Sequence, residues 1–244
     1  MLTKENSVIY YYLSGIILIP GLLLSMYATV KVNSTFSRYA RAFAKSGMTA
    51  AQVAMSMMVR AGLSDVHIVK AKGHLTDHYD PRSRTLALSE SVYNSSSVSA
   101  IGVAAHEVGH AIQHEQGYLP LKIRSALVPV VNISNRLLWP ILMIGIVFSF
   151  LVQSNTTFGN IFLIAGLIIF GASALFSLVT LPVETNASKR ALQILNSDGY
   201  LTADETAAAK KVLSAAALTY VTALLVSFLN LLRFLIIISR FRRD

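Results

Sequence analysis

The residues with the clearest chemical potential are His106, Glu107 and His110, which form the pattern His-Glu-Val-Gly-His. If this stretch is helical, histidines four positions apart lie on one face, about 6 Å apart along the axis. Two such imidazoles can bind one zinc ion, and the glutamate between them can reach a metal-bound water. The neighbouring residues are mostly apolar, and ionisable groups are costly to bury unless they are paired or bind a metal. The pattern therefore predicts a zinc site.

A catalytic zinc usually has three protein ligands and one water. His114 lies a further helical turn away, about 6 Å along the axis, so it is predicted to be a polar residue at a helix end instead. Positions 113 and 116 are glutamine, so the longer motif HExxHxxGxxH is absent. The other candidates are His67, His74, Asp77, His78, Asp80 and Glu184. We favour Glu184, which starts a predicted helix; the alternative is a carboxylate that only complements the helix dipole.

The composition indicates a membrane protein with no thiol chemistry. Of the 244 residues, 54% are hydrophobic and 14% are charged, against roughly 25% charged in average soluble domains. These values exclude a disordered chain and a highly charged soluble bundle. The chain has no cysteine, so any metal must be held by His, Asp or Glu. The net charge of +9 is interpreted as charge next to the membrane, and not as a nucleic-acid surface.

Four apolar stretches are long enough to cross a bilayer, at about residues 8–29, 137–152, 161–181 and 215–238. We interpret the first as a retained anchor and not as a signal peptide. With four spans, the segments that follow the first and third spans must emerge on the same side of the membrane. Basic residues near the spans favour the cytoplasmic side for both segments. Arg233 lies inside the fourth stretch, where we expect its long side chain to reach the membrane surface.

The four predicted spans divide the chain into five parts. They are a first transmembrane helix (1–29), a membrane-proximal α+β domain (30–136), a transmembrane hairpin (137–181), a helical segment with the third ligand (182–214), and a fourth transmembrane helix with a basic tail (215–244). The predicted fold class is thus mainly α: an integral membrane protein with four transmembrane helices and a small α+β domain formed by two loops on one side.

Local signals predict the elements that position the motif. Capping boxes at positions 49–52 and 202–205 indicate helix starts, the first helix ending at Gly62. Residues 66–70 and 85–88 have the composition of short strands around a turn-rich stretch at 74–83. A helix over 98–116 carries the histidines and ends at Gly117. Pro182 is expected in the first turn of a helix that reaches residue 195, and Asp198-Gly199 forms the next turn.

Three stretches together resemble the YugP-type neutral zinc metallopeptidases of bacterial membranes: HEVGHAIQH, LTDHYDP (75–81) and LPVETNAS (181–188). The similarity covers nearly the whole chain, and the HtpX-type membrane gluzincins are more distantly similar. The resemblance implies a zincin-like domain with zinc held by His106, His110 and Glu184, and Glu107 as the catalytic carboxylate. It also implies that the strand at 85–88 is a sheet edge that binds substrate. Ser188 stands where HtpX-type proteins have aspartate.

The sequence therefore predicts a membrane-embedded zinc endopeptidase that cleaves membrane or membrane-proximal proteins. Its expected partners are a peptide or protein substrate, membrane lipid, and a membrane protein or a second copy of the chain. Glu107 would take a proton from water, and His78, Tyr79 or Tyr220 would stabilise the oxyanion. Each of these three can instead be a turn or interface residue. The alternative function is a zinc-binding scaffold without activity; a transporter fits poorly, because the spans carry one charge.

Overall fold

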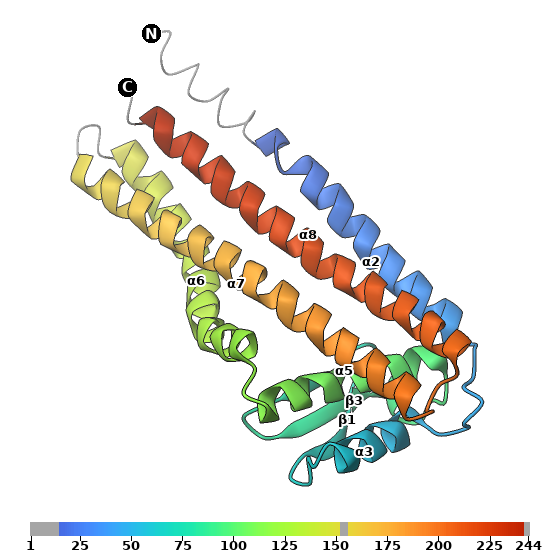
Figure 1. Ribbon diagram of the computed structural model, residues 1–244. Helices are drawn as coiled ribbons and strands as arrows, with labels where there is room; N and C mark the ends of the chain where they lie inside the picture. Colours follow the sequence, from blue (N-terminus) through green and yellow to red (C-terminus); the bar gives the residue numbers. More distant parts are fainter. Residues whose placement is uncertain (1–14, 152–155, 242–244) are drawn as a thin grey trace. The chain divides into compact units, whose positions relative to one another are not determined.

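The computed structural model describes residues 15–151 and 156–241, which are mainly helical with one small sheet (Figure 1). The chain divides into two compact units, each assembled from separate stretches of sequence. The first unit comprises Met1–Met26, Ile123–Thr180 and Val221–Asp244. The second comprises Tyr27–Lys122 and Leu181–Tyr220, and it contains the histidine motif together with Glu184.

Long helices supply the first unit: α2 (Ile19–Tyr39) up to Met26, α6 (Leu119–Leu151) from Ile123, α7 (Thr156–Ser197) up to Thr180, and α8 (Ala203–Phe241) from Val221. Among the described residues, two stretches are long and apolar enough to cross a membrane, Ile164–Ser197 and Ala203–Ile236. Both leave most of their apolar window unburied, unlike the core helix of a soluble protein. The described chain thus carries two candidate spans, where the sequence predicts four. Of the predicted span at 8–29, residues 8–14 lie outside the described residues. Of the predicted span at 137–152, residue 152 and the side chains of 138, 139 and 141–151 do.

Helix α7 is continuous through Pro182, so the predicted helix start at that residue is wrong. A proline inside a helix removes one backbone hydrogen bond, because its nitrogen carries no hydrogen. One turn further on, the Thr185 hydroxyl lies 2.9 Å from the Leu181 carbonyl oxygen and 3.2 Å from that of Pro182. The helix that carries Glu184 is therefore the same helix that carries the third apolar stretch.

The second unit contains a three-stranded sheet of β1 (His67–Ala71), β2 (His78–Asp80) and β3 (Thr85–Ser89). The strand order is β1-β3-β2, with β1 parallel and β2 antiparallel to β3. The expectation that 85–88 forms a sheet edge is therefore wrong, since β3 is central. Strand β2 lies within residues 74–83, which the sequence analysis predicted to be turns. Its Asp80 carboxylate accepts hydrogen bonds from the Arg82 amide and the Ser83 hydroxyl, both at 2.9 Å, and so folds β2 back on β3.

Helices α3 (Ala50–Arg60) and α5 (Val98–Glu115) enclose the core of the second unit together with β3. The predicted capping boxes at Thr49 and Thr202 are both formed. Gly62 and Gly117 take φ values of +73° and +64° where α3 and α5 end, as their positions predict. A four-residue helix that the sequence analysis missed, α4 (Glu90–Tyr93), connects β3 to the loop before α5. Most of α5 is buried, which places its histidines inside the unit.

Candidate metal centre

Both ends of helix α5, which carries His106 and His110, are defined by local signals. The Ser97 side chain accepts a hydrogen bond from the Ala100 amide at its start, and Gly117 follows its last turn. The apolar residues Ala104, Ala105 and Val108 between and beside the ligands have no exposed surface. Because these residues are packed in the core of the second unit, that packing defines the direction in which His106 and His110 project from the helix.

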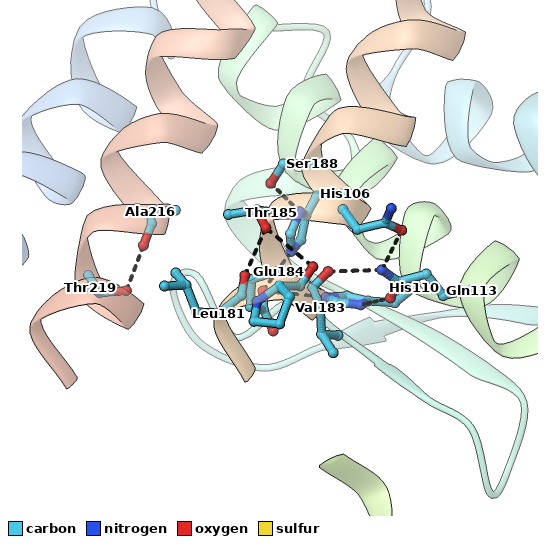
Figure 2. Close-up of polar contacts among 12 residues, drawn as sticks. His106, His110, Gln113, Leu181, Val183, Glu184, Thr185, Ser188, Ala216 and Thr219 are labelled. Atoms are coloured by element: carbon cyan, nitrogen blue, oxygen red, sulfur yellow. Dashed lines mark hydrogen bonds and ion pairs between the residues drawn. The ribbon is translucent and has the colours of Figure 1, made fainter. Parts of the chain in front are cut away.

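The third candidate ligand comes from α7, 78 positions later in the chain. The Glu184 Oε2 atom lies 3.1 Å from His106 Nε2 and 3.5 Å from His110 Nε2. Figure 2 shows the three side chains converging, and one ligand atom of each lies within 4.8 Å of the others. The two imidazole rings are 4.7 Å apart, centre to centre, and almost perpendicular. The structure therefore brings together the three residues that the sequence analysis proposed as ligands.

Each imidazole has its second nitrogen held by an oxygen of a neighbouring side chain. His106 Nδ1 lies 3.0 Å from Ser188 Oγ, and His110 Nδ1 lies 3.0 Å from Gln113 Oε1. A ring that donates through Nδ1 keeps a lone pair on Nε2 when it is neutral. The Nε2 atoms of both rings face the Glu184 carboxylate, and in this tautomer each offers a lone pair to a cation bound between them.

The electrostatics of His110 support the same conclusion. Burial of the ring lowers its pKa, but the hydrogen bond to Glu184 and the charge of Glu107 raise it by more, so that the pKa lies above its ordinary value. The site thus attracts positive charge, in the form of a proton or a metal ion. Two imidazole nitrogens and a carboxylate oxygen are the ligand set of many catalytic zinc sites, which keep a fourth position open. The residues present fit a zinc ion.

A cavity of about 270 Å³ opens beside the three ligands. Its wall includes His106, Glu184 and Glu107, with Tyr220 from α8 and Asp77 from the segment before β2. Glu107 is 8% exposed, and no hydrogen bond to its carboxylate is found among the residues that the structure describes. A carboxylate in this position can exchange a proton with a molecule in the cavity.

The candidate oxyanion residues lie in different places. Tyr220 lines the cavity, and neither His78 nor Tyr79 is among its lining residues. The exposed His78 has its Nδ1 2.9 Å from the Thr76 carbonyl oxygen, and the Tyr79 hydroxyl lies 2.9 Å from His114 Nδ1. The structure thus gives His78 and Tyr79 contacts in a turn and at the end of α5. His114 lies in the last turn of α5 and contacts Tyr79, as expected for a polar residue at a helix end.

Three further residues matter around the proposed metal ligands: Ser188, whose position the sequence analysis noted, and Gln113 and Gly109, whose roles it missed. Ser188 takes the contact to His106 for which HtpX-type proteins have aspartate, and Gln113 takes the equivalent contact to His110. Each lies one helical turn after a ligand, at i+4 from Glu184 and i+3 from His110, and this spacing was the available signal. Gly109 is the third, because α5 and α7 meet there with no room for a side chain.

Comparison with known proteins agrees with this geometry. The model of the family described as "Putative neutral zinc metallopeptidase" matches residues 14–239. A relative named "Putative membrane protease YugP", from Bacillus subtilis (strain 168), is 46% identical over 220 residues, which are 90% of this chain and 93% of the relative. No solved structure matches the chain with significance. The family match covers nearly the whole sequence and includes all three candidate ligands, with zinc as the cofactor that the family name states. The chain therefore belongs to the neutral zinc metallopeptidase family.

Proposed function

We propose that this chain is a membrane-embedded zinc endopeptidase that hydrolyses peptide bonds of membrane or membrane-proximal proteins. One observation carries the proposal: the Glu107 carboxylate shares a cavity with the imidazole of His106 and the carboxylate of Glu184. A site built only to hold a structural metal has no need of an additional acid beside the ligands, and structural zinc is usually enclosed by four protein ligands. Here His106, His110 and Glu184 supply three.

The chemistry divides among these residues as follows. When bound, zinc supplies the Lewis acidity that polarises the scissile carbonyl and makes a water more acidic. Glu107 takes the proton of the attacking water and then delivers it to the nitrogen of the leaving amine. Ser188 and Gln113 hold the two imidazoles with Nε2 toward Glu184. The Tyr220 hydroxyl, on the cavity wall, is our candidate for the donor that stabilises the oxyanion.

We expect the substrate to bind as an extended strand, which requires a sheet edge with free backbone groups. Strand β2 is an edge of the sheet, and β3 is not. Asp77, directly before β2, lines the cavity and accepts hydrogen bonds from the amide and hydroxyl of Ser89 at 2.7 and 2.9 Å. Strand β2 is thus fixed next to the cavity. Pairing of main chains would give loose preference for substrate sequence.

The membrane topology is part of the proposal. The relative's name and the two apolar helices support membrane association, and we expect a multi-pass arrangement in the cytoplasmic membrane with the site on the cytoplasmic side. Because the chain lacks cysteine, a single Asn196→Cys variant offers one exposed thiol near the end of α7. A membrane-impermeant maleimide should label it only after cells are opened. Labelling in intact cells would place the site outside.

The enzyme proposal is tested by Glu107→Gln, with exposed Glu90→Gln as the matched control. Both variants and the original chain are purified in detergent, analysed for zinc, and incubated with an unstructured protein substrate. We expect all three to hold about one zinc per chain, and only Glu107→Gln to lose cleavage. If the original chain and Glu107→Gln cleave equally, Glu107 is not the base and the mechanism is wrong. Zinc without cleavage in all three would favour the inactive scaffold.

A further inference from the structure

Gln113 is the most completely enclosed polar residue near the metal ligands. It has no exposed surface, although it lies on the same helix as His106 and His110. An amide buried without partners is costly, by about 1–3 kcal/mol in protein mutational data. Gln113 has its partners: Oε1 lies 3.0 Å from His110 Nδ1, and Nε2 donates to the Val183 carbonyl oxygen at 2.8 Å and to Asn186 Oδ1 at 2.9 Å.

The orientation of this amide follows from groups that can act in one way only. The Arg190 guanidinium can only donate, and its Nε lies 2.7 Å from Asn186 Oδ1, so this atom is an oxygen. The Val183 carbonyl can only accept. The Gln113 atom that faces both acceptors must therefore be the NH₂ group, and the atom that faces His110 must be the oxygen. It follows that His110 Nδ1 carries a hydrogen and donates it to Gln113.

This assignment has a direct effect on the metal site. A neutral His110 with its hydrogen on Nδ1 has its lone pair on Nε2, the atom 3.5 Å from the Glu184 carboxylate. The same Gln113 side chain also joins α5 to α7 on both sides of Glu184, through Val183 and Asn186. Gln113 therefore contacts His110 on one helix and, on the other, the residues one position before and two positions after Glu184.

We propose that Gln113 is a positioning residue for the metal centre: it selects the tautomer of His110 that can bind zinc, and it sets the distance between His110 and Glu184. The inference rests on the zinc site of the proposed function and on no catalytic step. Substitution of such outer partners of zinc ligands typically lowers metal affinity 10- to 100-fold. A glutamine that only fills core space would affect stability and leave zinc affinity unchanged.

The test measures zinc dissociation constants by chelator competition for Gln113→Met, Gln113→Glu and the original chain, each as the full chain in detergent. Gln113→Met keeps the size and removes every hydrogen bond, and we expect zinc to bind about 10- to 100-fold more weakly. Gln113→Glu can still accept the hydrogen of His110 Nδ1 but cannot donate to α7, so it should recover part of the affinity. Ser99→Ala is the matched control, because Ser99 is a fully buried polar residue on α5 in contact with Ser97 and away from the ligands.

A second measurement separates positioning from general loosening. Cobalt replaces zinc, and its visible absorption reports on the geometry of the ligands. We expect a changed spectrum for Gln113→Met and an unchanged spectrum for Ser99→Ala. The proposal is overturned if Gln113→Met binds zinc within threefold of the original chain, or if Gln113→Glu binds no better than Gln113→Met. Neither zinc affinity nor the cobalt spectrum depends on cleavage. If Glu107→Gln showed that the enzyme proposal is wrong, the test of Gln113 would still be valid.

Discussion

The backbone of Gly109 lies directly against the backbone of Ala187, between the two parts of the metal site. A Cβ at Gly109 would lie 2.6 Å from the Ala187 carbonyl oxygen and 3.2 Å from its Cα. Gly109 immediately precedes His110 on α5, and Ala187 is three residues beyond Glu184 on α7. Glycine at this position is therefore what allows the imidazole and the carboxylate to approach.

Gly109→Ala should separate α5 from α7 and weaken both zinc binding and folding. The added methyl group meets backbone atoms, which cannot move aside as a side-chain end can, and overpacking of this kind costs about 1–3 kcal/mol. Zinc content and the thermal unfolding midpoint in detergent measure the two effects. Gly102→Ala is the matched control on the same helix, because its Cβ would meet the Ala209 Cβ at an ordinary 3.4 Å. If Gly102→Ala and Gly109→Ala lose equal amounts of zinc, the close approach is not the cause.

Ser188 should contribute to zinc affinity through His106. Its hydroxyl oxygen lies 3.0 Å from His106 Nδ1, within hydrogen-bond distance, so Ser188→Ala leaves that nitrogen without this partner. We expect zinc affinity to fall about tenfold, as for other outer partners of zinc ligands. Ser188→Asp restores an acceptor of the kind found in HtpX-type proteins and should bind zinc at least as tightly as the original chain. Equal affinities of the alanine and aspartate variants would contradict this role.

Zinc binding and the stability of the zinc-free protein should depend on pH with opposite signs. Burial lowers the pKa of His110, but Glu184 and Glu107 raise it further, above its ordinary 6.5. Zinc must displace this proton, so its affinity falls as the pH drops through the raised pKa. In zinc-free protein the same proton stabilises the native state; this contribution is complete below 6.5 and is lost as the pH rises through the folded-state pKa.

The pH effect is measured as unfolding midpoints of zinc-loaded and chelator-treated protein between about pH 6 and pH 9. The His110 contribution should make the difference between the two midpoints grow toward high pH. The His114→Gln variant is the control, because His114 contacts Tyr79 and is not a proposed ligand. A difference that shrinks as the pH rises would show that the raised pKa of His110 does not govern metal binding.

Tyr220→Phe should lower the turnover number and leave zinc content unchanged. The phenyl ring of phenylalanine still fills the cavity wall, and the hydroxyl that we propose as the oxyanion donor is removed. Removal of one such donor costs about 100- to 1,000-fold in turnover. Tyr79→Phe loses only a hydroxyl that contacts His114, so its turnover should remain close to that of the original chain. A larger loss in Tyr79→Phe than in Tyr220→Phe would exchange the roles of the two tyrosines.

The sequence was sufficient to select the three side chains that the structure brings together, because the signals that point to them are mostly local. The spacing of His106 and His110 has chemical meaning on any helix, and Glu184 was favoured because it lies in a predicted helix among apolar residues, on the same predicted side of the membrane. Capping boxes and terminal glycines likewise depend on neighbouring residues, and α3 and α5 end where predicted.

Features that depend on contacts between distant segments were not predictable in this way. Strand β2 has three residues inside a stretch of turn formers, and only its pairing with β3 makes it a strand. The restriction at Gly109 comes from a carbonyl group on another helix, and Gln113 becomes important only through His110 and α7. Pro182 was misread for the opposite reason: its local preference for a helix start is overridden by the continuous helix α7.

His106 and Glu184 lie 78 positions apart, and this separation has a consequence for biosynthesis. A ribosome that has delivered α5 has supplied two imidazoles and the Glu107 carboxylate, but not the third ligand. Glu184 follows only after α6 and most of α7 have been translated. A nascent chain thus holds an incomplete centre through the intervening translation, and any proteolytic competence arises only after Glu184 has been delivered.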